Sequence, residues 1–429
     1  MKIAVVGLGH IGLPLAVQYA SRGHEVLGID VEPGIVEAIN RGESPHRDEQ
    51  ALIDRVPELS AAGRLRATTW ADAEAMREAD AVVVIVPVVV DAERQIDYGP
   101  IDAATRDIAR HVGRGALVIY ETTLPVGTTR TRFGPMLAKG SGLELDRDLF
   151  LAFSPERVLV GRVFLDLQRY PKIVGGTSDE STRRAVEFYR SVLEPDTEVT
   201  RVANAETAEM TKLAETTYRD VNIAYANELA RFASRNRIDV MEVIGAANSQ
   251  PYSHIHQPGV GVGGHCIPVY PHFLFNDDPE LRIPPLAREI NEGMGAFTVD
   301  LIEDRIGSLD GQAVLVLGIA YRGDVREDAF SSAFRLRDEL LAAGAILFGH
   351  DPYFAAEHLR QLGFEPYDMD APGPNRGSIR VAVLQAAHAE YRDMDPSRIR
   401  GLELFVDGRN AIDREPYERA GIGYVGIGR

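Results

Sequence analysis

The stretch that decides the fold is residues 2–12, which read KIAVVGLGHIG. Its first five residues predict a buried strand, and the apolar run 13–22 that follows the glycines predicts a helix. A second strand-like segment, residues 25–29, ends at Asp30. This order of strand, G-x-G-x-x-G, helix and acidic residue is the context in which the glycine pattern binds a dinucleotide.

Each glycine of the pattern has its own expected role. Gly7 makes the tight turn, Gly9 lets the backbone approach a pyrophosphate, and Gly12 lets the helix pack closely on the strand. Asp30 would accept hydrogen bonds from the adenosine ribose, and its charge would repel a 2′-phosphate. The predicted cofactor is therefore NAD rather than NADP. The expected cofactor contacts in this segment are Gly7, Gly9, His10, Ile11, Gly12 and Asp30.

Further strand-like segments at 81–86, 116–120 and 150–153 alternate with helical stretches. Alternating β and α units indicate a parallel, doubly wound sheet that binds ligands at the carboxyl ends of its strands. Three groups follow such strand ends, and they are Pro87, the run 121–129 with Thr122 and Thr123, and the run 154–158 with Glu156, Arg157 and Val158. The threonines could simply form a turn and the glutamate could cap a helix, so both interpretations stay open.

A long helix is predicted from Ala205 to Arg237, because Asn204 is a good N-cap and no Pro or Gly interrupts the run. About 30 helical residues extend roughly 45 Å. One face carries a mostly apolar stripe, which predicts a homodimer with the stripes paired across a two-fold axis. The stripe is Met210, Leu213, Thr217, Val221 and Ala224. Lys212 lies on another side, as a functional lysine or as a solvated one.

The C-terminal third repeats the β/α rhythm, with strand-like segments at 313–319, 345–348, 381–384 and 404–406. It predicts a second Rossmann-like domain, and because the glycine pattern is missing, its ligand should not be a second NAD. We therefore expect an α/β protein with an N-terminal Rossmann domain, a long central helix and a C-terminal Rossmann-like domain. The expected boundaries are 1–200, 201–300 and 301–429.

The only cysteine of the chain, Cys266, lies in the run 258–273, PGVGVGGHCIPVYPHF. Glycine occupies four of the six positions 259–264, and consecutive N–H groups in such a bend suit anionic oxygens. A thiol beside such a bend is a candidate covalent catalyst. The competing interpretation is that Cys266 is a small buried hydrophobe.

The composition of the chain excludes some classes of partner and indicates a cellular compartment. A net charge of −18 over 429 residues argues against nucleic acid and anionic membranes as partners. A single cysteine cannot form an intrachain disulfide, which fits a reducing compartment. The N-terminus lacks the apolar core of a signal peptide, and the longest apolar run, 81–90, contains Pro87 and is too short to span a bilayer. We therefore expect a cytoplasmic protein.

Taken together, these motifs resemble the nucleotide-sugar 6-dehydrogenase family, which includes UDP-glucose, UDP-N-acetylmannosamine and UDP-N-acetylglucosamine dehydrogenases. The resemblance covers nearly the whole chain. It rests on residues 7–16, 123–129, 154–159, Lys212, 218–224, 263–267 and 407–410. The pieces His265-Cys266-Ile267 and Arg219-Asp220-Val221-Asn222-Ile223 are similar to the branch that acts on N-acetylhexosamine nucleotides.

The resemblance implies a four-electron oxidation of the C6 alcohol of a UDP- or dTDP-linked hexose or N-acetylhexosamine to a carboxylate, with two NAD used in turn and no metal. Cys266 would carry a thiohemiacetal and then a thioester, and Lys212 would stabilise the oxyanions. Thr123 and Glu156 would position or deprotonate water. Further cofactor contacts would be Pro87, Thr122 and Arg326. Substrate contacts would be Arg157, Val158, Tyr252, His256, Gly259, Gly261, Tyr321 and Arg322.

The chain departs from the family pattern at several positions. Thr216 replaces an asparagine four residues after the lysine, Tyr270 replaces an aspartate four residues after the cysteine, and Arg322 replaces a lysine. Two alternatives therefore stay open. A two-electron hydroxy-acid dehydrogenase would leave Cys266 without a role. A non-catalytic NAD-binding regulator would account for Thr216 and Tyr270.

Overall fold

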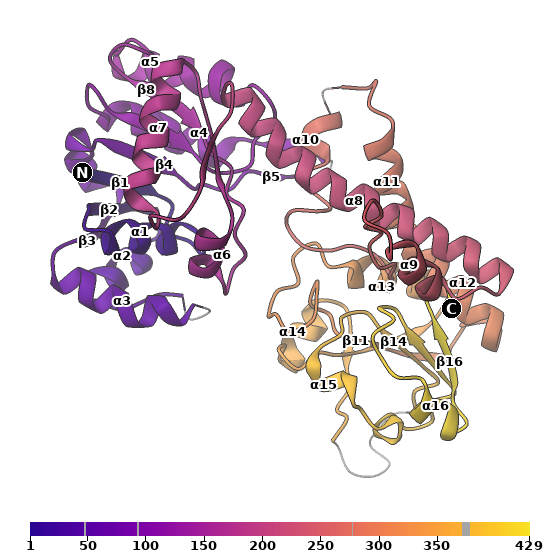
Figure 1. The fold of residues 1–429 in the computed structure, drawn as a ribbon. Helices are drawn as coiled ribbons and strands as arrows, with labels where there is room; N and C mark the ends of the chain where they lie inside the picture. Colours follow the sequence, from indigo (N-terminus) through magenta and orange to yellow (C-terminus); the bar gives the residue numbers. More distant parts are fainter. Residues whose placement is uncertain (47–48, 92–93, 277, 371–377) are drawn as a thin grey trace. The chain divides into compact units, whose positions relative to one another are not determined.

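The structure is a computed structural model that describes residues 1–46, 49–91, 94–276, 278–370 and 378–429. It separates into two compact units, each built around its own sheet (Figure 1). The first unit comprises Met1–Glu215 with His272–Asn276, and the second comprises Thr216–Pro271 with Asp277–Arg429. In the part of the chain described, no helix is both long and apolar enough to cross a membrane.

The first unit contains an eight-stranded sheet in the order β10-β9-β8-β7-β4-β1-β2-β3. Its strands are β1 (Lys2–Val6), β2 (Glu25–Ile29), β3 (Leu65–Thr68), β4 (Ala81–Val84), β7 (Leu117–Tyr120), β8 (Phe150–Phe153), β9 (Lys172–Gly176) and β10 (Val199–Arg201). A separate antiparallel pair joins β5 (Val89–Val90) to β6 (Ile96–Asp97). The predicted parallel, doubly wound sheet is confirmed, except that β9 runs antiparallel to β8.

Helices flank this sheet and cover its apolar strands. They are α1 (Gly12–Ser21), α2 (Pro33–Asn40), α3 (Gln50–Ala61), η1 (Trp70–Glu78), α4 (Gly99–His111), η2 (Thr129–Phe133), α5 (Gly134–Ser141), α6 (Val163–Arg169), α7 (Asp179–Val192) and α10 (His272–Phe275). The core consists of the buried residues of β1, β2, β4, β7 and β8 packed on α1, α3 and α7. The carboxyl ends of β1, β4, β7 and β8 meet at one edge, so the residues that follow them are brought together.

Helix α8 (Ala205–Asn236) is the predicted long helix. The side-chain oxygen of Asn204 accepts a hydrogen bond from the Thr207 N–H at 2.9 Å, which confirms the predicted N-cap. The predicted dimer stripe is wrong as an exposed surface, because Leu213, Thr217 and Ala224 are buried within the chain itself. An apolar stripe indicates that one face of a helix is buried, but it does not tell whether the same chain or a partner subunit buries it.

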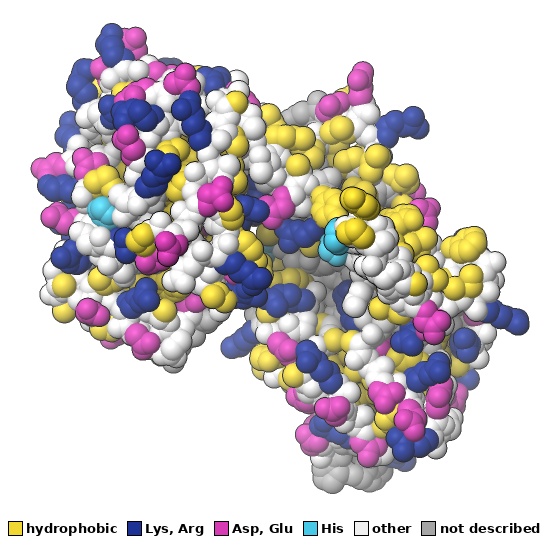
Figure 2. Space-filling model, in the orientation of Figure 1, with side chains coloured by type: hydrophobic (Ala, Val, Ile, Leu, Met, Phe, Trp, Pro, Cys, Tyr) yellow, Lys and Arg dark blue, Asp and Glu magenta, His cyan; other side chains and the backbone are white. Residues whose placement is uncertain are grey.

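Four large apolar side chains of α8 are exposed, and they are Met210, which belongs to the predicted stripe, and Tyr218, Tyr225 and Phe232, which do not. The last three are spaced by seven residues, so they share one side of the helix. Ile283 and Leu286 of α11 are also exposed. In the view of Figure 2, hydrophobic side chains gather over the part of the second unit that holds α8, α9 and α11.

The second unit contains a six-stranded, all-parallel sheet in the order β13-β12-β11-β14-β15-β16. Its strands are β11 (Ala313–Leu317), β12 (Ile346–His350), β13 (Glu365–Pro366), β14 (Val381–Leu384), β15 (Leu404–Asp407) and β16 (Gly423–Gly426). Its helices, besides most of α8, are α9 (Val240–Ala247), α11 (Ile283–Glu292), α12 (Met294–Ile306), α13 (Ser332–Ala342), α14 (Ala356–Gln361), α15 (Ala389–Arg392), η4 (Pro396–Arg398) and α16 (Glu415–Arg419).

The second sheet repeats the turn at the start of the first. Gly7 follows β1 with φ +91°, and Gly318 follows β11 with φ +80°. A Cβ on Gly7 would lie 2.6 Å from the carbonyl oxygen of Ile85, and one on Gly318 would lie 2.5 Å from that of Ala386. Both glycines therefore turn the chain against the end of the neighbouring strand. The second Rossmann-like domain is thus confirmed.

Candidate active site

The glycine loop of the first unit has the shape that a dinucleotide requires. A Cβ on Gly12 would lie 1.8 Å from the carbonyl oxygen of Gly7, so the helix can approach the strand only with glycine there. A Cβ on Gly9 would meet no atom within 4 Å, so Gly9 faces open space. Gly7 and Gly12 are thus required by the fold, while Gly9 leaves room for a pyrophosphate. These residues fit NAD.

Asp30 is fixed at the end of β2 beside this loop. One carboxylate oxygen accepts the Leu8 N–H at 2.6 Å, and the other accepts the Glu32 N–H at 2.9 Å. A carboxylate has about four acceptor positions, so two remain for ribose hydroxyls. The rings of His10 and His46 contact each other at a tilt of 37°, with centroids 4.3 Å apart, and both border the same loop.

The run after β7 is tied down at both ends. Thr122 donates its hydroxyl to the carbonyl oxygen of Val86 at 2.7 Å, which joins the ends of β7 and β4. At the far end, the carboxylate of Glu209 on α8 accepts the Gly127 N–H at 2.5 Å and both the N–H and the hydroxyl of Thr129 at 2.9 and 2.6 Å. Burial raises the pKa of Glu209 to about 7. Thr123 is buried between these anchors, and Pro87 is exposed.

The structure brings Lys212 and Glu156 together. Lys212 Nζ donates to the main-chain carbonyl oxygen of Glu156 at 2.7 Å. The Glu156 carboxylate accepts the N–H groups of Arg157 and Val158 at 2.7 and 3.2 Å, and Lys172 Nζ at 2.8 Å. Burial alone would raise the pKa of Glu156, but the ammonium of Lys172 and these hydrogen bonds hold it below its ordinary value.

Lys172 and Glu121 are site residues that the sequence did not single out. Lys172, the first residue of β9, donates to Glu121 at 2.7 Å as well as to Glu156. Glu121, directly after β7, also accepts the hydroxyls of Tyr189 and Tyr19 at 2.6 and 3.3 Å. The only available signal was the charge of Glu121 after an apolar strand; nothing in the sequence links it to a lysine 51 residues away.

Arg157 is fixed beside Glu156. Its Nε lies 2.9 Å from Glu215 Oε2, and its Nη1 donates to the carbonyl oxygen of Pro171 at 3.2 Å. A small pocket opens here, and its lining includes Glu156, Arg157, Val158 and Lys172. The carboxyl ends of β7 and β8 thus present an ammonium, a carboxylate and an arginine in one unit.

In the second unit, the glycines before Cys266 allow close contact with the loop that follows β11. A Cβ on Gly264 would lie 2.9 Å from the Tyr321 ring, and the Gly264 N–H donates to the carbonyl oxygen of Ala329 at 3.2 Å. His265 pairs with Glu327, and this hydrogen bond raises the pKa of His265. Cys266 itself is half-buried. Because Gly264 lies against the Tyr321 ring, Cys266 and Tyr321 are on neighbouring loops.

The start of the glycine run is bound to the second sheet through Arg409. Its Nη1 donates to the carbonyl oxygen of Gly261 at 2.9 Å, and its Nη2 donates to Ser332 Oγ at 3.1 Å. Burial lowers the pKa of Arg409 to about 10. The Gly259 N–H donates to the Asn227 side chain at 2.9 Å. At least this N–H of the predicted anion cradle is therefore used within the chain.

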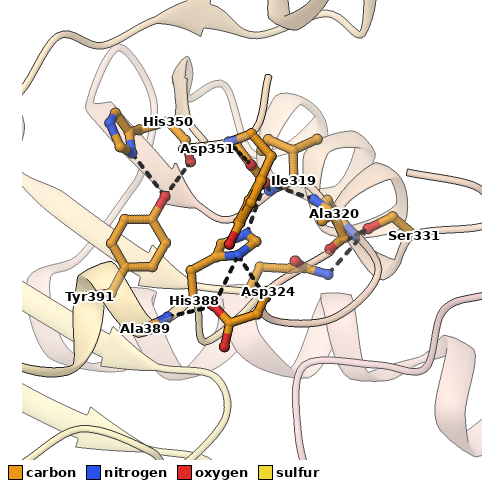
Figure 3. Close-up of polar contacts among 12 residues, drawn as sticks. Ile319, Ala320, Asp324, Ser331, His350, Asp351, His388, Ala389 and Tyr391 are labelled. Atoms are coloured by element: carbon orange, nitrogen blue, oxygen red, sulfur yellow. Dashed lines mark hydrogen bonds and ion pairs between the residues drawn. The ribbon is translucent and has the colours of Figure 1, made fainter. Parts of the chain in front are cut away.

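The loop 319–324, which carries Tyr321 and Arg322, is anchored by Asp351 and His388 (Figure 3). Asp351 accepts the N–H groups of Ile319 and Ala320 at 2.7 and 3.0 Å, and lies 3.1 Å from His388 Nε2. His388 Nδ1 accepts the Asp324 N–H at 2.9 Å, which leaves the ring proton on Nε2, pointing at Asp351. Burial would raise the pKa of Asp351, but His388 and the N–H donors hold it below its ordinary value.

The remaining predicted contacts lie on exposed or half-exposed segments of the second unit. Arg322 is exposed, and its Nε donates to the Tyr321 hydroxyl at 3.0 Å. Arg326 is also exposed. Tyr252 is 92% exposed. His256 is half-buried, and burial together with the charge of Arg219 lowers its pKa.

Comparison with known proteins places the chain. Residues 1–193 match the NAD binding domain of the UDP-glucose/GDP-mannose dehydrogenase family, residues 206–292 its central domain, and residues 315–414 its UDP binding domain. The chain belongs to this family. It is an NAD-dependent nucleotide-sugar dehydrogenase.

Curated relatives match three quarters or more of the chain. The UDP-N-acetyl-D-mannosamine dehydrogenase of Pyrococcus horikoshii is 34% identical over 100% of this chain and 99% of its own. That of Salmonella typhimurium is 38% identical over 75% of this chain and 78% of its own. The solved structure of the Pyrococcus horikoshii enzyme superposes with a TM-score of 0.87 at 33% identity, covering 100% of this chain and 99% of its own.

A second solved structure points to a different sugar. The NDP-N-acetyl-D-galactosaminuronic acid dehydrogenase of Methanosarcina mazei superposes with a TM-score of 0.86 at 31% identity, covering 100% of this chain and 95% of its own. These relatives are therefore all named as dehydrogenases of N-acetylated sugars, whereas the sugars in their names differ.

Proposed function

We propose that this dehydrogenase oxidises the C6 hydroxyl of a UDP-linked N-acetylhexosamine to a carboxylate through a covalent intermediate on Cys266. UDP-N-acetyl-D-mannosamine is the first candidate, since the full-length relative in Pyrococcus horikoshii carries that name. The observation that carries the proposal is the hydrogen bond from Lys212 Nζ to the Glu156 carbonyl, because it fixes an ammonium beside a carboxylate at the carboxyl ends of the NAD-domain strands.

The proposed reaction has three stages. The C6 alcohol first loses two electrons and two hydrogens and becomes an aldehyde. Cys266 Sγ then bonds to C6 and forms a thiohemiacetal, which a second two-electron oxidation converts to a thioester. Water finally cleaves the C–S bond and yields the carboxylate and the free thiol. Bound NAD supplies the two-electron acceptor in both oxidations.

The residues of the first unit have separate roles in this scheme. Lys212 stabilises the negative oxygen in each stage by its charge, an effect often worth several kcal/mol in a site shielded from water. Glu156 accepts the proton of the attacking water. Thr123 orients that water. These roles stay proposals that the contacts of Lys212 and Glu156 support.

The proposed cofactor residues are those of the glycine loop with Asp30, Pro87, Thr122 and Arg326. The charge of Asp30 supports NAD over NADP, since a 2′-phosphate would be repelled. Comparable kcat/KM with the two cofactors would contradict this. The proposed substrate contacts are Arg157, Val158, Tyr252, His256, Gly259, Gly261, Tyr321 and Arg322. The division of these roles over residues 1–200, 201–300 and 301–429 is part of the proposal.

We further propose a cytoplasmic homodimer. The proposed contact surface is no longer the buried stripe but the exposed row Tyr218, Tyr225 and Phe232. Ile283 and Leu286 are likewise large, apolar and exposed. Large aromatic side chains are enriched in the buried centres of subunit interfaces. The single cysteine supports a reducing compartment.

Counting NADH per sugar tests the function. The purified protein is incubated with NAD and, in turn, UDP-N-acetylmannosamine, UDP-N-acetylglucosamine, UDP-glucose and a dTDP-hexose. Two NADH per sugar consumed supports the proposal and identifies the substrate. One NADH would support the two-electron alternative. Release of no NADH would contradict the proposed oxidation of these sugars.

A further inference from the structure

Behind Glu156 lies a chain of buried charges that the reaction described above does not use. Glu121 is 1% exposed and Lys172 is 5% exposed. Lys172 Nζ lies 2.7 Å from a Glu121 oxygen and 2.8 Å from a Glu156 oxygen, so two carboxyls share one ammonium. The three residues come from the end of β7, the end of β8 and the start of β9, which are adjacent strands.

The groups that face Glu121 are identified on every side. Tyr189 of α7 and Tyr19 of α1 donate their hydroxyls to it, and Lys172 donates from β9. Glu156 lies in hydrogen-bond contact with it. Lys172 is the only cation among these four groups. With Glu156 ionised and Lys172 protonated, the net charge of Glu121, Glu156 and Lys172 is therefore zero when Glu121 carries a proton and −1 when it does not.

We propose that Glu121 is a positioning residue that controls the basicity of Glu156 through direct contact and through their shared partner Lys172. The proposal rests on the proposed function, in which Glu156 takes a proton from water. It adds a residue that does not touch the substrate but decides when Glu156 can act.

The acceptor positions of Glu156 explain the control. Three of about four are taken by the N–H groups of Arg157 and Val158 and by Lys172 Nζ. A neutral Glu121 donates its proton to the fourth, which leaves none for water. Ionisation of Glu121 removes that donor, opens the position and adds a negative charge beside Glu156. Glu156 then binds water and holds its proton more strongly.

Glu121 should change its protonation state near neutral pH. Burial raises the pKa of Glu121 to about 7, because its ionised form is poorly solvated and Lys172 compensates only in part. Below this pH, Glu121 is neutral and Glu156 is saturated and weakly basic. Above this pH, Glu121 is ionised, and one acceptor position of Glu156 becomes free for water. If hydrolysis of the thioester limits turnover, kcat should rise with pH through about 7.

The test compares kcat and KM from pH 5.5 to 9 for the full-length protein and its Glu121→Gln variant, with saturating NAD and sugar. Glutamine has the shape of a neutral glutamic acid and cannot ionise. In the natural protein kcat should rise about tenfold around pH 7, equivalent to a change of about one pKa unit in the base. In the variant this rise should vanish while KM changes less than about twofold.

Tyr189→Phe is the matched variant. It removes one hydrogen bond that stabilises ionised Glu121 but keeps the carboxyl, so the rise should persist with its midpoint at higher pH. A Glu121→Gln profile that keeps the natural midpoint would overturn the proposal. So would a uniform loss of kcat at every pH, which is the signature of a purely structural role.

A second measurement does not depend on turnover. Carboxyl-¹³C-labelled glutamate gives one NMR resonance per side chain. The natural protein should show two resonances with midpoints near pH 7, from Glu121 and Glu209, and Glu121→Gln should keep that of Glu209 and lose that of Glu121. If no sugar is oxidised, the proposed function has failed, and this titration still decides whether Glu121 carries the exchangeable proton. Its absence in the natural protein would overturn the proposal.

Discussion

The ammonium of Lys212 donates a hydrogen bond to the main-chain carbonyl oxygen of Glu156, with the two atoms 2.7 Å apart. This contact joins α8 to the segment that follows β8. Lys212 is only 7% exposed, so its charge is shielded from water and acts strongly on nearby oxygens. A lysine that the sequence leaves open as functional or solvated is thereby held at the candidate site of the first unit.

Lys212→Ala should lower kcat for both oxidations, because the same charge stabilises each oxyanion. We expect a loss of about 10²- to 10³-fold, as for the removal of one oxyanion-stabilising group elsewhere. Stopped-flow NADH absorbance measures both steps. Lys139→Ala, which removes an exposed lysine of α5, is the control and should stay within about twofold. A Lys212→Ala enzyme with natural kcat would contradict the role.

Cys266→Ser should uncouple the two oxidations. The first needs only the alcohol and NAD, so a single turnover should still yield some NADH. The second should stall, because a serine hydroxyl is a far weaker nucleophile than a thiol. Steady-state NADH production should be close to zero, with any slow adduct on the new serine visible by mass spectrometry. Release of two NADH per sugar at a natural rate would refute the covalent intermediate.

Gly9→Ala and Gly12→Ala should fail in different ways. A Cβ on Gly9 meets no atom within 4 Å, so the variant should melt within a few degrees of the natural protein but bind NAD more weakly. A Cβ on Gly12 would lie 1.8 Å from the Gly7 carbonyl oxygen, so that variant should lose several kcal/mol of stability. Thermal melts and NAD titrations separate the two. Equal NAD affinity in Gly9→Ala would show that the cofactor lies elsewhere.

Glu209→Gln should destabilise the first unit by about 2–3 kcal/mol, because an amide cannot accept all three donors and would set its NH₂ against an N–H. Glu206→Gln, one turn away, breaks a solvent-exposed ion pair with Arg130 and should cost less than about 1 kcal/mol. Chemical denaturation measures both. Similar losses of unfolding free energy in the two variants would mean that the buried hydrogen bonds of Glu209 stabilise the first unit no more than the exposed ion pair of Glu206 does.

Glu209 should also make stability depend on pH. Its pKa is about 7 in the folded protein against an ordinary value of 4.5, so the folded state keeps this proton where the unfolded chain has released it. The free energy of unfolding should therefore fall as pH rises from about 4.5 to 7, and Glu209 should add no further change above that. Glu209→Gln should flatten this part of the curve. Glu121 acts in the same direction, so some slope should remain.

Tyr225→Asp should weaken the proposed dimer by placing a charge in the exposed aromatic row. Sedimentation at micromolar concentration should then show monomer for the variant and dimer for the natural protein. Arg235→Ala changes an exposed polar residue near the end of the same helix and should leave the dimer intact. A natural protein that sediments only as monomer would refute the assembly.

The sequence predicted the strands and helices well where apolar runs and glycines alternate, because a buried parallel strand is apolar on both faces. It did not predict that β9 reverses its direction, since a short apolar strand reads alike both ways. It named Lys212, Glu156 and Thr123, which follow recognisable motifs. It missed Lys172 and Glu209, because their importance arises only from partners 51 and 80 residues away. The prediction that the apolar stripe of α8 is exposed was wrong for a related reason, since apolarity alone does not identify which surface packs against the helix.

The turn at Gly318 has a consequence for stoichiometry. In the second sheet, the Asp351 carboxylate occupies the N–H groups of Ile319 and Ala320, and Ser331 caps the start of α13. That helix begins at Ser332, whereas α1 begins at Gly12, directly beyond the open Gly9. Of the two described strand-to-helix turns, only the one at Gly7 thus leaves the open backbone that a dinucleotide needs. In the proposed reaction, which uses two NAD in turn, the first NADH would therefore have to leave before the second NAD binds. The proposed bond to Cys266 would hold the partly oxidised sugar during that exchange.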